Sequence, residues 1–198
     1  FASLFLLVFM MPYFLTYPAG LTAARTGLVM IVPFLFLLVI SPISGMLADR
    51  LGSRMLCTLG MAFMMLSLFS LIFLSPEKGI AAVVWRMALA GIGTALFVSP
   101  NNTAIMGAVP LHQRGIASGA AATARTLGMV SGVALAGTIF SAFISLQGEG
   151  TGAYVPDLAA AFMTGFRYVM AAGSGLAAIG VAVTFSRGWE NRKNADQV

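Results

Sequence analysis

The stretch TGLVMIVPFLFLLVISPISGMLA-DRLGSR-MLCTLGMAFMMLSLFSLIFLSP, residues 26–76, decides the fold. Two runs without Asp, Glu, Lys or Arg, residues 26–48 and 55–76, flank a short charged segment at residues 49–54. A run of roughly 18 or more apolar residues without charge is long enough to cross a bilayer as a helix. The stretch therefore predicts two transmembrane helices joined by a charged hairpin.

The rest of the chain has the same character. Of its 198 residues, 59% are hydrophobic and 9% are charged, and the net charge is +5. A soluble domain carries about 25% charged residues, so this chain has too few charges to cover a surface in water. Its basic residues are scattered between apolar runs and form no patch, which excludes nucleic acid as a partner. The composition predicts an all-α membrane protein whose main partner is the lipid bilayer.

Charged and Gly/Pro-rich segments divide the chain into six apolar stretches. We expect transmembrane helices at about residues 1–17, 27–48, 55–75, 80–109, 115–146 and 158–186, which together form one transmembrane unit, followed by a cytoplasmic tail at 187–198. The first stretch is the shortest. It begins at Phe1 with neither an initiator Met nor the positive charge that opens a signal peptide. We therefore expect the chain to be a segment of a longer protein.

The basic residues predict which ends of the helices face the cytoplasm. Short cytoplasmic loops of membrane proteins carry an excess of Lys and Arg. The hairpins at 49–54 and 110–114 and the tail hold the larger set, and the other side holds Arg25, Lys78 and Arg167. The larger set consists of Arg50, Arg54, Arg114, Arg187, Arg192 and Lys193. We therefore expect both hairpins and both ends of the chain in the cytoplasm.

The hairpin GMLADRLGSR, residues 45–54, is the most specific motif. Gly52 permits a turn that β-carbons resist, and Asp49 suits the positive N-terminus of the next helix. The hairpin resembles the loop signature G-x-L-A-D-R-x-G-x-R/K of the major facilitator superfamily at every fixed position. The resemblance implies a cytoplasmic latch that includes Gly45, Asp49, Arg50, Gly52, Arg54 and, from the next hairpin, Arg114. The alternative is a loop whose basic residues only hold it inside.

A second resemblance covers residues 86–136. Its motifs are Arg86, AGIG at 90–93, SPNN at 99–102, VP at 109–110, RGIASG at 114–119, TARTLG at 123–128 and GVA at 132–134. This stretch is similar to the C-terminal half of fourteen-helix drug:proton antiporters of the EmrB/QacA type. One departure is Met87, where that family more often has Gly.

The two resemblances imply a fold and a mechanism. The six helices would form one half of the transporter, as two inverted three-helix repeats. Helices one and four would line the cavity, two and five would flank the missing N-terminal half, and three and six would face lipid. The protein would export hydrophobic or cationic drugs in exchange for protons by alternating access, in a bacterial cytoplasmic (inner) membrane. No acidic residue lies within a predicted span, so the proton site would lie in the missing half.

The fourth predicted span carries the candidate cavity residues. Pro100 removes a backbone hydrogen bond in the middle of the span. Polar side chains beside it would be costly against lipid, so we expect them to face protein or a water-filled cavity. The alternative is that the two Asn side chains satisfy the backbone that Pro100 frees. These candidates are Thr94, Ser99, Asn101 and Asn102.

Two arginines, Arg86 and Arg125, could act inside the membrane. Arg125 shares a helix face with a stripe of small residues at four-residue spacing, Gly128, Gly132 and Ala136, which suits close helix packing. Arg125 is therefore a further cavity candidate or a contact between the transporter halves, and the alternative is that it snorkels to the cytoplasmic headgroups. For Arg86, near the start of its span, snorkelling is the favoured interpretation.

The sequence excludes several other classes of function. One Cys, one His and no acid within a span cannot form a catalytic nucleophile–base pair or a metal cluster, so we expect no enzyme, no metal and no cofactor. Two alternatives to the drug pump stay open. One is a facilitator that exports a specific metabolite, and the other is a self-contained six-helix channel or scaffold protein.

Overall fold

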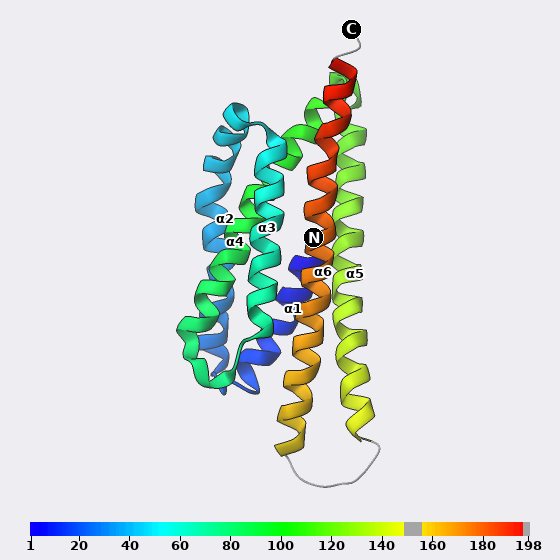
Figure 1. The fold of residues 1–198 in the computed structure, drawn as a ribbon. Helices are drawn as coiled ribbons and strands as arrows, with labels where there is room; N and C mark the ends of the chain where they lie inside the picture. Colours follow the sequence, from blue (N-terminus) through cyan, green and yellow to red (C-terminus); the bar gives the residue numbers. More distant parts are fainter. Residues whose placement is uncertain (149–155, 196–198) are drawn as a thin grey trace.

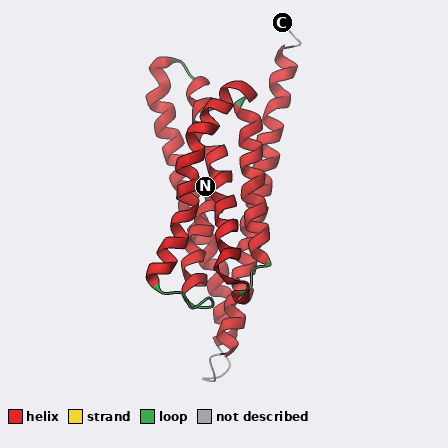
Figure 2. Ribbon diagram, turned by 90° about the vertical axis from the view of Figure 1, so that its left-hand side faces the viewer, coloured by secondary structure: helices red, strands yellow, loops and turns green. Residues whose placement is uncertain are grey.

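The computed structural model describes the backbone of residues 1–148 and 156–195. In this part of the chain, helices are joined by short loops and no strand is present (Figure 2). Its helices are α1 (Ala2–Thr16), α2 (Ala23–Leu51), α3 (Ser53–Ile72), η1 (Pro76–Lys78), α4 (Gly79–Gly107), η2 (Leu111–Gln113), α5 (Arg114–Gly148) and α6 (Pro156–Ala195). Five of them, α2 to α6, are long and apolar enough to cross a membrane, whereas α1 is a shorter apolar helix. The predicted all-α membrane fold is confirmed.

The connections alternate between two ends of the bundle. The α2–α3 connection, the α4–α5 connection and the C-terminal end of α6 lie at one end, at the top in Figure 1. The α1–α2 and α3–α4 connections lie at the other end. The two basic hairpins therefore share one end, as their positions in the sequence predict. Below, this end is called the hairpin end.

The helices pack as two related halves. The principal neighbours follow the order α2, α4, α3, α6, α1, α5 across the bundle, and α5 also contacts α6 (Figure 1). If α1 is exchanged with α4, α2 with α5 and α3 with α6, the same order of neighbours results, read from the opposite end. Because α1 and α4 run in opposite directions, the group α1–α3 is inverted along the bundle axis relative to the group α4–α6. This is the arrangement expected of two inverted three-helix repeats.

The core forms where α1 meets α3 and α6. Almost the whole inner surface of α1 is enclosed, including Leu7 and Met10, both fully buried. The ring of Phe14 on α1 lies 4.9 Å from that of Phe166 on α6. Leu68 of α3 completes the cluster. By contrast, α2 and α5 are the least buried of the long helices.

Glycines set the closest helix crossings. A methyl group on Gly60 of α3 would lie 2.6 Å from the carbonyl oxygen of Gly93 on α4, and one on Gly93 would lie 2.7 Å from that of Gly60. On the other side of α4, a methyl group on Gly91 would lie 2.7 Å from the Cα of Pro33 on α2. The three helices therefore touch backbone to backbone, a form of packing that small residues allow in membranes.

The structure differs from the prediction at the helix ends. Residues 49–54 were expected to form a loop, but α2 continues to Leu51 and α3 begins at Ser53, so Gly52 alone connects them. Gly52 has φ +84°, a conformation that glycine adopts without strain. At the other end of the chain, α6 continues to Ala195, so its helix includes most of the predicted tail.

Candidate functional site

The hairpin residues lie at the junction of α2, α3 and α6. Arg54 of α3 donates a hydrogen bond from Nη2 to the backbone carbonyl of Phe185 on α6. Its guanidinium carbon also lies 5.3 Å from the centre of the Phe185 ring, within the range of a cation–π contact. Arg54 therefore ties the beginning of α3 to α6 at the hairpin end.

The other predicted latch residues have different surroundings. Arg50 in the last turn of α2 and Arg114 at the start of α5 are both exposed. Among the described side chains, no hydrogen bond or ion pair joins Arg114 to the α2–α3 hairpin. The side chain of Asp49 lies outside the described part of the chain. Gly45 lets α2 approach α4, because a methyl group there would lie 3.1 Å from Oγ of Ser99.

Ser44 of α2 lies beside the segment of α4 that precedes Pro100. Its hydroxyl donates to the carbonyl oxygens of Ala95 on α4 and Ser41 on α2, both at 2.9 Å. Ser44 therefore ties α2 to α4 just before Pro100. Serines are common within apolar runs, so Ser44 carries no specific signal in the sequence.

Arg125 and Asn102 meet between α4 and α5. Arg125 donates from Nη2 to Oδ1 of Asn102 at 3.2 Å, so the two side chains join α4 to α5. Both residues are half-buried. The guanidinium carbon of Arg125 lies 4.8 Å from the centre of the Phe1 ring. Its Nε is enclosed and has no hydrogen-bond partner among the described residues.

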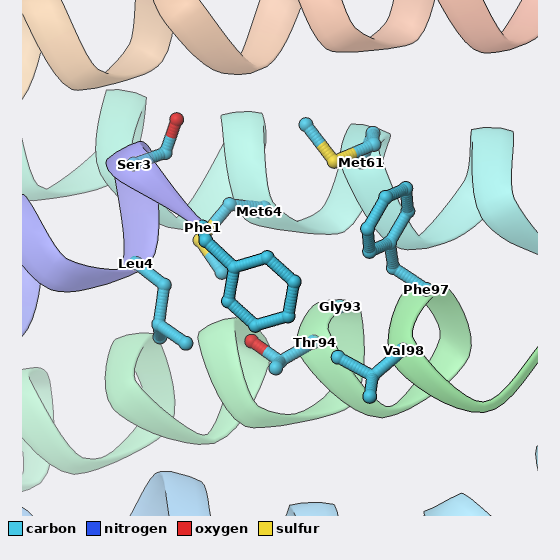
Figure 3. Close-up of a pocket in the computed structure, with 9 residues that line it drawn as sticks. All are labelled: Phe1, Ser3, Leu4, Met61, Met64, Gly93, Thr94, Phe97 and Val98. Atoms are coloured by element: carbon cyan, nitrogen blue, oxygen red, sulfur yellow. The ribbon is translucent and has the colours of Figure 1, made fainter. Parts of the chain in front are cut away.

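Thr94 lies in a separate pocket between α1, α3 and α4 (Figure 3). This pocket is small and partly open to the surface. Its walls are mostly apolar and include the thioethers of Met61 and Met64 and the ring of Phe97. The Thr94 hydroxyl donates to the carbonyl oxygen of Ala90 at 2.8 Å, within its own helix. Of the predicted cavity residues, Thr94 lines this pocket, and Arg125 and Asn102 form the pair described above. Ser99 lies against Gly45 of α2 instead, and Asn101 is half-buried.

The small-residue stripe of α5 faces the beginning of α1. A methyl group on Gly132 would overlap the carbonyl oxygen of Ala2, and one on Gly128 would lie 3.3 Å from Cβ of Phe1. Ala136, one turn further, is fully buried. The stripe therefore packs within this chain, against α1.

Arg86, for which the sequence favours snorkelling, is held by protein groups at the end of α3. This side chain is only 7% exposed. Its Nε donates to the carbonyl oxygen of Ser70 at 3.1 Å, and its guanidinium lies 4.4 Å from the centre of the Trp85 ring. Ser70 belongs to the last turn of α3, where carbonyl groups lack partners within the helix. Arg86 therefore caps the end of α3.

Among the described residues, no group of three or more His, Cys, Asp or Glu side chains could hold a metal ion. The single Cys57 is buried in α3. The polar groups described above can hold helices together or bind a solute, but they do not form a nucleophile with an adjacent base.

Comparison with known proteins agrees with this architecture. The family model of the Major Facilitator Superfamily matches residues 1–196. The transporter YebQ of Escherichia coli is 36% identical over 133 residues, which cover 67% of this chain and 29% of YebQ. The multidrug resistance protein Stp of Mycobacterium tuberculosis is 38% identical over 133 residues, which cover 67% of this chain and 24% of Stp.

A third relative has a defined solute in its name. The riboflavin transporter RibZ of Clostridioides difficile is 30% identical over 133 residues, 67% of this chain and 29% of RibZ. The matched region spans about a quarter of the length of these relatives. YebQ and RibZ are named as transporters and Stp as a multidrug resistance protein.

Proposed function

Because the chain belongs to the major facilitator superfamily, we propose that it is the C-terminal half of a fourteen-helix drug:proton antiporter of the EmrB/QacA type. The chain is part of a membrane transporter and not of an enzyme. In our proposal it exports hydrophobic or cationic compounds across a bacterial inner membrane. The observation that carries this proposal is the inverted packing of α1–α3 and α4–α6 combined with 38% identity to a multidrug resistance protein.

The exposed faces of α2 and α5 support a missing partner half. These helices are the least buried of the five long ones, although they are not polar. Leu38 of α2 is 73% exposed and Leu127 of α5 is 66% exposed. Apolar faces of this extent need lipid or protein to cover them. We propose that the N-terminal half of the transporter packs on α2 and α5.

The proposed mechanism is alternating access, in which the two halves rock around a site near the midplane. The α2–α3 hairpin with Arg54 and the exposed Arg50 and Arg114 would form part of the cytoplasmic latch that holds one state. Asp49, from the same hairpin, belongs to the proposed latch through the sequence signature. Protons would bind in the N-terminal half, because Glu77 in η1 is the single acidic side chain among those that the structure describes.

A second candidate function is export of one defined metabolite. The similarity to the riboflavin transporter RibZ supports this second candidate, because RibZ and the multidrug resistance protein Stp each match 133 residues of this chain. The two candidates differ in breadth of substrate, and one assay separates them.

Dye efflux from cells tests the proposed function. Cells that express the full-length protein should lose several unrelated apolar and cationic dyes faster than cells with an empty vector, and a proton uncoupler should abolish the difference. Export of riboflavin with no effect on any dye would instead establish the metabolite transporter. Export that persists with the uncoupler would remove proton coupling from the proposal.

Cysteine labelling tests the proposed orientation. We expect a Leu111→Cys variant, at the hairpin end, to react with a membrane-impermeant maleimide only after the cells are permeabilised. A Tyr17→Cys variant, at the other end, should react in intact cells. Both native side chains are well exposed, at 77% and 74%, so the comparison is matched. Other cysteines, including Cys57, are replaced beforehand, and the reverse labelling pattern would invert the proposed orientation.

A further inference from the structure

The surroundings of Arg125 leave its charge without a described partner of opposite sign. Its one described hydrogen bond goes to Asn102, whose side chain is neutral. The Phe1 ring offers only its π face. Glu77, the one acidic side chain in the described part of the chain, lies in η1 at the opposite end of the bundle from the hairpin end, near which α5 begins.

An arginine in a membrane-spanning helix needs compensation. A charged side chain at this depth is costly unless it pairs with other groups or faces a water-filled cavity. The guanidinium has five N–H donors in a rigid fork, and the single described bond from Nη2 to Asn102 uses one of them. The enclosed Nε has no partner among the described residues. This site is therefore rich in donors and poor in acceptors.

Asn102 adds to this excess of donors. Because its Oδ1 accepts the bond from Arg125, the amide nitrogen remains as a donor beside the guanidinium. Both side chains are half-buried, so a solute can reach the pair from one side. An arginine fork next to a second N–H donor is an arrangement that suits a carboxylate.

We propose that Arg125 and Asn102 form a recognition site for a carboxylate group on the exported compound. This inference rests on the proposed function and narrows it. Compounds that combine an apolar body with a carboxylate bind to this half of the transporter more tightly than compounds with the same body that carry only a positive charge. The apolar body lies against surfaces such as the Phe1 ring.

A pair of dyes with the same ring system tests the proposal. Tetramethylrhodamine and its methyl ester share a xanthene cation and differ in one free carboxylate. Their affinities for the purified full-length transporter can be measured by fluorescence anisotropy, without any need for transport. A charge-assisted hydrogen bond contributes roughly a factor of ten or more in binding. We therefore expect the wild type to bind the acid about tenfold more tightly than the ester.

Two substitutions should remove this preference by different routes. Arg125→Gln deletes the charge and should bring the affinities for acid and ester together. Asn102→Asp keeps Arg125 but places a permanent carboxylate beside it, so it should weaken acid binding and strengthen ester binding. Arg125→Lys keeps the charge without the fork and should retain part of the preference. Arg167→Gln, an exposed arginine of α6, is the control and should leave the ratio unchanged.

Other binding results overturn the proposal. Equal binding of acid and ester by the wild type, or no binding of either, means that the site does not recognise carboxylates. A preference that survives Arg125→Gln places carboxylate recognition elsewhere. Equal weakening of both dyes by Arg125→Gln in protein of normal yield means that Arg125 pairs with an acidic side chain of the N-terminal half. If the acid binds as expected but cells do not export it, the proposed function fails while the site stands.

Discussion

Replacing Gly60 with Ala should severely destabilise the helix bundle. The added methyl group would lie 2.6 Å from the carbonyl oxygen of Gly93 and 2.8 Å from the backbone nitrogen of Phe97. Backbone atoms within a helix cannot rotate away as the end of a side chain can, so α3 and α4 must separate along their contact. Overpacking of this kind costs about 1–3 kcal/mol, and we expect the upper end of that range. Denaturation of the full-length protein in mixed micelles measures the change.

Gly175 of α6 provides a matched control for Gly60. A methyl group there would meet no atom within 4 Å. Alanine also favours helices over glycine by roughly 0.5–1 kcal/mol. We therefore expect Gly175→Ala to be neutral or slightly stabilising. If the two variants unfold at the same denaturant concentration, close backbone packing does not hold α3 against α4.

Arg86→Met should produce the second large effect. Arg86 is almost fully buried and joins α4 to the end of α3 through the Ser70 carbonyl. The negative end of a helix dipole attracts a cation, and a hydrogen bond from a charged donor contributes about 1.5–3 kcal/mol. Methionine fills a similar volume but removes the charged donor, which leaves the Ser70 carbonyl with only the 3.3 Å bond from the backbone N–H of Phe73. We expect the free energy of unfolding to fall by about 2–3 kcal/mol.

The comparison with Arg167→Met separates this effect from a general loss of charge. Arg167 is exposed on α6 and has no hydrogen bond in the described structure. Its replacement should change stability by no more than about 0.5 kcal/mol. Arg86→Lys should fall between the two, since an ammonium group cannot both reach Ser70 and stack on Trp85 as the guanidinium does. An Arg86→Met variant as stable as the wild type would show that the cost of burying the charge cancels its bonds.

Much of the fold could be predicted from the sequence because the bilayer restricts the possibilities. Only helices and closed barrels satisfy the backbone within lipid, so uncharged runs such as residues 55–76 indicate helices directly. The two basic hairpins must lie at the same end of the bundle, because two membrane-spanning helices, α3 and α4, separate them in the sequence. The exact helix ends were harder to predict. The residues on both sides of Gly52 were expected to form a loop, but they belong to α2 and α3.

The contacts between helices could not be predicted in the same way. Gly60 and Gly93 stand in apolar runs that offer no sign of which face meets a neighbour. Arg86 is close in sequence to the start of its span, but its environment depends on the end of α3, which only the packed bundle brings beside it. Asn102 and Arg125 were both cavity candidates, yet their hydrogen bond joins two helices and requires coordinates.

The single-residue connection at Gly52 has a mechanical consequence. Since α2 ends at Leu51 and α3 begins at Ser53, the two long helices cannot shift independently at the hairpin end. Arg54, two residues after Gly52, donates a hydrogen bond to the backbone carbonyl of Phe185 on α6. A displacement of α6 near Phe185 is therefore expected to move α3 and, through Gly52, also α2. This coupling runs along the hairpin end and does not involve the core of the bundle.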